Sequence, residues 1–301
     1  PMLLRAISSL GLNVQLVGIA VTIACGLGAV CTFASWAQDR IGRPAARTAV
    51  LLLVLYPYAW YLFGAVYSDA LFLFAALGAF WLLERDHPVL AGLAGALASA
   101  ARPIGIAVVV GLVAVTVVRR GGLRSWRSLR PADAGGLLSV AGIGSWITYQ
   151  WIRFGEPLAF AETQASVGWD QEPGPRTWFK VTFLQRVRRL PEYIQSAWPD
   201  PANEGNPIEL QYTLGLMLQA LFVVIILGSV VLVVRRLGWG YGLYPLAVAG
   251  MAAVGSKDFQ GTGRYMLAAF PAFAVAGPLP VDRAGPRRPS PPVSSLLPVW
   301  G

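Results

Sequence analysis

Charged side chains are scarce in this chain of 301 residues. Only 13% of them are Asp, Glu, Lys or Arg, about half the ~25% usual in soluble domains. Cysteine and histidine are nearly absent: Cys25 and Cys31 lie in one apolar run, and His87 is the single histidine. These shortages exclude metal sites built on Cys and His and any His-dependent catalytic triad. The sequence also lacks a Walker-type glycine-rich loop and a G-x-G-x-x-G pattern, so it predicts no nucleotide site.

Long uncharged runs occupy much of the chain instead. They cover residues 6–38, 48–68, 134–152, 210–234 and 237–256, and the shortest has 19 residues. A bilayer core of ~30 Å needs about 20 apolar helical residues, and strict polar–apolar alternation, the mark of a β-barrel, is absent. We therefore expect an all-α, polytopic transmembrane bundle of about nine segments. They are 13–37, 45–63, 68–83, 88–101, 103–118, 134–152, 211–234, 239–255 and 264–280.

Basic residues, all arginine except Lys180 and Lys257, mark alternate connections between these segments. By the positive-inside rule the Arg-rich connections are cytoplasmic. The net charge of +9 therefore indicates orientation in the cell (plasma) membrane rather than nucleic-acid binding. Nine crossings place residue 1 outside and the C-terminus inside, and this orientation predicts a further helix before Pro1. The short segments 88–101 and 103–118, separated by Arg102-Pro103, either cross or re-enter.

Two regions differ from the membrane domain, which we place at residues 1–280. The connection 153–210 is long and polar, and we expect it outside the membrane. Within it, four apolar residues recur at helical spacing opposite basic ones, which predicts an amphipathic helix lying on lipid or packed on the membrane domain. They are Phe179, Phe183, Val187 and Leu190. The tail 281–301, rich in Pro, Arg and Ser, is expected to be disordered and cytoplasmic.

Polar residues at the external membrane edge are the candidates for chemistry. Asp69 is the only acid placed against an apolar segment, where it either caps a helix or serves function. Arg102 and Arg264 stand at the same edge, and their guanidinium forks match phosphate oxygens. The alternative is that either arginine pairs with Asp69 or Asp258. Chains of intramembrane acids and lysines, expected of proton-coupled carriers, are missing.

Four motifs in order resemble one enzyme family. They are Tyr67-Ser68-Asp69, Arg102-Pro103-Ile104-Gly105, the stretch 153–160 followed by Gln164 and Trp169, and Gly263-Arg264-Tyr265. This pattern resembles the PIG-V-like mannosyltransferases, the family of the second mannosyltransferase of GPI-anchor synthesis and its bacterial relatives. The resemblance covers roughly residues 1–280.

The resemblance implies an inverting glycosyltransferase of the GT-C class. Its donor would be polyprenyl-phosphate-mannose, its acceptor an external glycolipid, glycan or protein, and it would hold no bound cofactor. In that family the base is an acid in a Trp-Asp pair of the first external loop. That first external loop is not in this sequence, so we expect the base upstream of Pro1, with Asp69 as the one candidate here. The implied substrate-binding residues are Tyr67, Ser68, Arg102, Arg153, Gln164, Trp169, Arg264 and Tyr265.

Two other functions use the same features. A carrier (flippase) for lipids or lipid-linked sugars would use the arginines to bind its cargo without catalysing a reaction. A catalytically dead scaffold would need neither the binding arginines nor a catalytic base. Membrane lipids are partners in every case. An acid in the upstream coding sequence, close to the membrane on the outside, would favour the enzyme.

Overall fold

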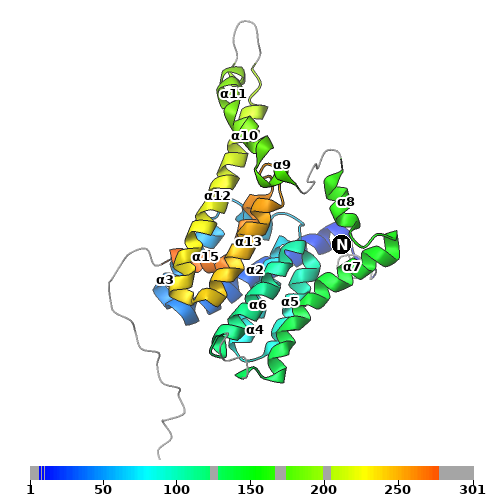
Figure 1. Ribbon diagram of the computed structural model, residues 1–301, viewed down its shortest axis with the longest axis vertical. Helices are drawn as coiled ribbons and strands as arrows, with labels where there is room; N and C mark the ends of the chain where they lie inside the picture. The colour runs from blue at the N-terminus through cyan, green and yellow to red at the C-terminus, as the bar shows by residue number, and fades with distance from the viewer. Residues whose placement is uncertain are drawn as a thin grey trace, which may run out of the picture.

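A computed structural model describes residues 7, 9, 11–122, 128–166, 174–198 and 205–277, and within them the chain is all-α, without β-strands. Figure 1 shows a helical bundle from which one long helix, α12, extends toward a smaller group of helices. Short 3₁₀ helices occur at Ala59–Leu62, Pro103–Gly105, Pro131–Ser139 and Met266–Ala268. The α-helices are α2 (Val14–Ile41), α3 (Arg43–Val54), α4 (Asp69–Glu84), α5 (Pro88–Ala101), α6 (Ile106–Arg119), α7 (Val140–Phe154), α8 (Ala159–Ala165), α9 (Pro175–Trp178), α10 (Val181–Arg188), α11 (Leu190–Ala197), α12 (Ile208–Leu237), α13 (Trp239–Val254), α14 (Thr262–Tyr265) and α15 (Phe270–Ala276).

Three of the nine segments expected as continuous helices are broken, and those predictions were wrong. The segment 45–63 ends as an α-helix at Val54, because Pro57 lacks an N–H and disfavours helix at the residue before it. The segment 264–280 divides into α14, a 3₁₀ turn and α15, and Pro271 stands in the first turn of α15. The segment 134–152 begins as a 3₁₀ helix containing adjacent glycines, which are poor helix formers.

Two helices, α2 and α12, are long and apolar enough to cross a membrane. Only 33% of the most apolar stretch of α2 and 17% of that of α12 are buried inside the protein. Leu27, Val224 and Val231, for example, are more than half exposed. Apolar side chains that face outward over such lengths are suited to contact with lipid.

The core joins α2, α4, α13 and α15 through aromatic side chains. The ring of Phe270 lies edge-on to Trp36, at 4.9 Å between centroids, and at 5.4 Å from those of Phe80 and Tyr244. All four side chains are fully buried. Such edge-to-face pairs contribute about 0.5–1.5 kcal/mol each beyond their buried area. They fix α15, and therefore the preceding α14, against the bundle.

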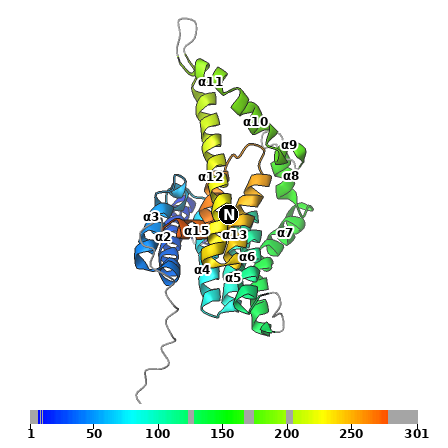
Figure 2. The ribbon, with the colours of Figure 1, turned by 60° about the vertical axis from the view of Figure 1, so that its left-hand side comes forward.

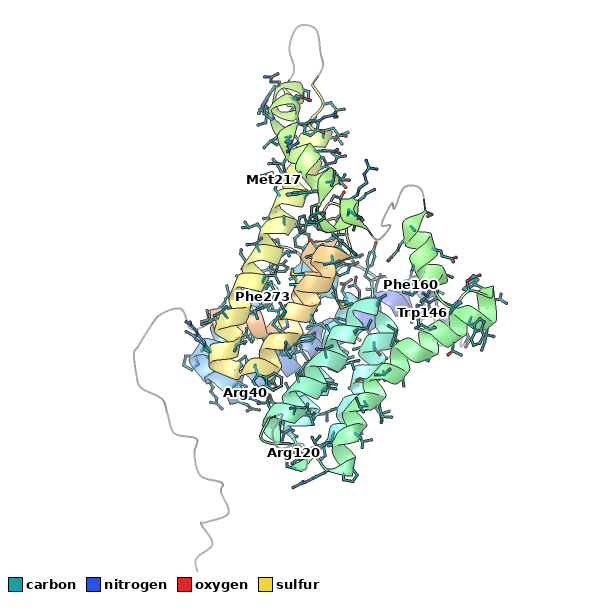
Figure 3. The ribbon with its side chains drawn as sticks, viewed as in Figure 1. Arg40, Arg120, Trp146, Phe160, Met217 and Phe273 are labelled. Atoms are coloured by element: carbon teal, nitrogen blue, oxygen red, sulfur yellow. The ribbon has the colours of Figure 1, made fainter. Side chains whose placement is uncertain are left out.

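The arginine-rich connections gather at one end of the bundle. Glu84, the last residue of α4, accepts hydrogen bonds from Arg40, Trp36 and Tyr241. Arg120 pairs with Asp133 at 2.7 Å. Figure 3 shows Arg40 and Arg120 together at this lower end. Asp69 begins α4, 15 residues before Glu84, so it lies about 22 Å from Glu84 along the helix at 1.5 Å per residue.

The expected external amphipathic helix is interrupted, so its prediction as one helix was wrong. The helix α9 ends at Trp178, and Lys180 takes a left-handed conformation with φ of 54° before α10 begins. The helices α10 and α11 meet at Arg189, directly before Leu190-Pro191. Phe183 packs edge-on against Phe259 at 5.0 Å, so part of this segment packs on the bundle, as one of the two alternatives predicted.

Candidate functional site

A cavity of about 690 Å³ lies at the end of the bundle opposite the arginine-rich connections. Its walls come from the connection after α3, the break between α5 and α6, and the helices α8, α12, α13 and α14. Volumes of about 300–1,000 Å³ are typical of ligand sites. The described residues that carry polar groups into its lining are Tyr58, Tyr61, Arg102, Gln164, Tyr212, Gln219, Ser256, Gln260, Arg264 and Tyr265.

Arg102 is held at this cavity by Asp69. The Arg102 Nη1 donates to Asp69 Oδ1, and the two side chains are 10% and 4% exposed. Pro103 prevents α5 from continuing, so Arg102 adopts an extended backbone there. The structure thus confirms the alternative in which Arg102 pairs with Asp69. Asp69 lies beside Arg102, outside the lining of the large cavity, and this geometry favours a positioning role over proton transfer.

Arg264 carries a charge that no acid neutralises in the described part of the chain. None of the ion pairs formed there includes its guanidinium, and its buried Nε has no hydrogen-bond partner. Its Cζ lies 5.6, 5.1 and 5.3 Å from the ring centroids of Tyr61, Tyr67 and Tyr265. Cation–π attraction to these rings holds the guanidinium in place, and the guanidinium keeps its full positive charge. The expected alternative, pairing of Arg264 with Asp69 or Asp258, is not observed.

The backbone before Arg264 is fixed on three sides. The Tyr56 hydroxyl donates to the Gly263 carbonyl at 2.8 Å, and the Gly263 N–H donates to Gln219 Oε1 at 3.2 Å. A Cβ on Gly263 would lie 2.4 Å from the Tyr58 ring, so only glycine fits there. Tyr265 also packs against Arg102, whose Cζ lies 4.6 Å from the centroid of the Tyr265 ring. The two arginines therefore converge on one tyrosine.

The remaining residues expected at the site lie in different places. Gln164, on α8 in the connection 153–210, lines the cavity. Tyr67 is 56% exposed but stacks with Arg264. Ser68 precedes α4 without capping it through its side chain, and Arg153 is exposed and outside the lining. Trp169 and the tail 281–301 lie outside the described residues.

Sequence reasoning missed several lining residues. Gln219 is a half-buried amide of α12, and an amide in the middle of the uncharged run 210–234, eight residues after Gln211, was a signal for it. Tyr58 and Tyr61 belong to an aromatic run, YPYAWY, which the resemblance included without assigning roles. Tyr212 donates to Asp258 Oδ2 at 3.1 Å, and nothing in the sequence links these two residues.

Lys180 joins the connection 153–210 to the rim of the cavity. Its Nζ donates to the Ser256 carbonyl and lies 4.9 Å from the Phe259 ring centroid. Burial lowers the pKa of the Lys180 ammonium to about 8, and the negative charge of Asp258 opposes part of that shift. Ser256 itself lines the cavity, so this contact joins the loop to the site.

The stability of the folded state should increase as pH rises from about 8 to 10.5. In this window the folded chain binds fewer protons at Lys180 than the unfolded chain, whose lysine titrates at its ordinary 10.5, so the folded state gains stability. Trace acetylation followed by mass spectrometry should give a half-maximal reaction of Lys180 near pH 8 in the folded chain. In denaturant the midpoint should move to about 10.5. A midpoint above pH 10 in the folded chain would contradict the burial.

The chain was compared with known families, proteins and structures. No family model matches it, and neither the curated proteins nor the solved structures contain a match. The family resemblance therefore rests on the motifs in the sequence.

Proposed function

We propose that this chain is the membrane domain of a polyprenyl-phosphate-sugar-dependent glycosyltransferase of the GT-C class. In this proposal the bundle crosses the membrane up to nine times, the donor carries mannose, and the acceptor is an external glycolipid, glycan or protein. The observation that carries the proposal is Arg264, an arginine that pairs with no acid of the described residues and lines a cavity of about 690 Å³.

The chemistry fits these residues. In an inverting transfer the acceptor hydroxyl attacks the anomeric carbon, and the bond from that carbon to the phosphate oxygen breaks. The leaving phosphate takes the electron pair and the acceptor proton goes to a carboxylate base. Cations fixed beside the leaving phosphate stabilise its developing charge. Arg264 and Arg102 take that role, while Asp69, Gln219 and the tyrosines position them.

The described lining contributes donor-binding groups and no carboxylate. We therefore test donor binding instead of turnover. The purified full chain in detergent should bind polyprenyl-phosphate-mannose saturably and more tightly than the uncharged polyprenol. Equal binding of the two would refute the phosphate site. Transfer of the bound molecule between leaflets of a vesicle, without glycosyl transfer, would instead support the carrier.

The proposed orientation places the cavity outside the cell. In a chain whose Cys25 and Cys31 are replaced by serine, Arg176→Cys should react with an impermeant maleimide in intact cells, whereas Arg43→Cys should react only after permeabilisation. Both parent residues are exposed in the structure, on α9 and α3 respectively. The opposite labelling pattern would invert the orientation. Labelling of both in intact cells would mean an even number of crossings between them, whereas the proposed orientation requires an odd number.

A further inference from the structure

A second concave site lies on the external helices, apart from the cavity described above. It has a volume of about 430 Å³ and lies at the junction of α10 and α11. Pro191 in the first turn of α11 ends the hydrogen-bond ladder of α10, and the resulting bend turns the side chains of both helices toward one space. Its lining is Thr182, Gln185, Arg186, Arg188, Arg189 and Tyr193.

The charge of this site is only partly neutralised. Arg186 pairs with Glu209 at 2.6 Å and stacks on Tyr212, with 4.6 Å from Cζ to the ring centroid. Arg188 and Arg189 form no ion pair with any acid in the described parts of the chain. Arginines in the last turn of α10 also offset its macrodipole, but that role does not require them to line a cavity. Two unpaired guanidinium groups with adjacent hydroxyl and amide groups suit a phosphate.

The length of α12 indicates the depth at which this site lies in the bilayer. Glu209 precedes Arg235 by 26 residues on one continuous helix, about 39 Å along its axis. A bilayer measures about 30 Å across its hydrocarbon core and about 40–45 Å with its headgroup layers. With Arg235 at the cytoplasmic interface, Glu209 lies in the opposite headgroup layer, and the ion pair to Arg186 brings the site to that depth. Figures 1 and 2 both show α11 beside the N-terminal part of α12.

The same segment exposes large apolar side chains. Trp178, Phe179, Leu184, Ile194 and Trp198 are between 45% and 70% exposed. Tryptophan and other aromatic residues concentrate at the membrane interface, where their rings lie among the headgroups. Basic groups beside exposed aromatic rings are therefore complementary to an anionic lipid surface.

We propose that the junction of α10 and α11 binds the phosphate headgroup of an anionic phospholipid of the outer leaflet, through Arg188 and Arg189. The inference rests on α12 crossing the bilayer, which is part of the proposed function, but it requires no glycosyl transfer. The bound lipid would hold the external connection, and with it Gln164 and Lys180, at the membrane surface over the cavity.

Native mass spectrometry of the full chain in detergent tests this proposal. With phosphatidylglycerol and phosphatidylcholine supplied in equal amounts, the chain should retain phosphatidylglycerol selectively. The double variant Arg188→Gln/Arg189→Gln should lose about thirtyfold in that affinity, at about a factor of five per basic residue near a lipid surface. Arg188→Lys/Arg189→Lys should keep most of it. The matched control Arg176→Gln, an exposed arginine of α9 outside the site, should behave as the parent chain.

Three results would overturn the proposal. They are equal retention of the two lipids, an unchanged affinity in the Gln/Gln variant, and saturation of the site by inorganic phosphate with no lipid retained. The third would reassign the site to a free anion. Because Arg264→Ala should leave phosphatidylglycerol retention unchanged while weakening donor binding, failure of the lipid site is distinguishable from failure of the proposed function.

Discussion

Arg264→Ala should weaken binding of polyprenyl-phosphate-mannose by about ten- to hundredfold. A hydrogen bond to a charged group is worth about 1.5–3 kcal/mol, and no other unpaired arginine lines the described cavity. Arg264→Lys should bind with intermediate affinity, because an ammonium keeps the charge but loses the planar fork. Binding is measured with the labelled donor on purified chain in detergent.

The structure supplies controls for this variant. Arg264 contacts its surroundings through three tyrosine rings, so the alanine variant loses cation–π contacts as well as the charge. An unchanged thermal transition would show that the fold survives. Arg176→Ala removes an exposed arginine of α9, outside the cavity lining, and should bind the donor like the parent chain. Parent-like binding by Arg264→Ala would remove the phosphate role from this residue.

Asp69→Ala should destabilise the fold by about 3–5 kcal/mol. The substitution leaves the Arg102 guanidinium, 10% exposed, without its counterion, and a buried charge without a partner is costly. The double variant Asp69→Leu/Arg102→Met should lose much less, because both charges disappear together and similar volumes fill the site. Equilibrium unfolding of the three chains in mixed micelles measures the difference.

The two Asp69 variants also separate structure from function. The double variant should fold and yet bind the donor less well than the parent chain, since it lacks one of the two cavity arginines. A loss below about 1 kcal/mol for Asp69→Ala would mean that water already solvates Arg102. Asp69 would then be free for a role other than positioning this arginine.

Local chain chemistry determined the boundaries of several elements. The segment predicted at 88–101 is α5, residue for residue, because Pro88 starts it and Pro103 stops it. The long apolar runs likewise became α2 and α12 within a few residues at each end. Prolines and charged residues act on their immediate neighbours in the chain, so the sequence shows directly where these helices begin and end. The all-α class follows from the same runs.

Breaks inside apolar runs were harder to foresee. Pro57 ends a helix, whereas Pro245 lies within α13 without ending it. The difference depends on whether neighbouring helices satisfy the freed backbone groups and pack against the ring. Packing of that kind is not encoded within the run itself.

Partner choice at the site was decided only by the tertiary structure. The sequence placed Asp69, Arg102 and Arg264 at one membrane edge and left open which arginine pairs with the acid. The packing of α4 against α5 brings Arg102 to Asp69, and the core contacts of α15 hold Arg264 away from any acid among the described residues. Ion pairs depend on distances of a few ångströms between distant segments. The hydrophobic pattern predicted which helices are suited to a membrane, and packing determined which arginine has no acidic partner among the described residues.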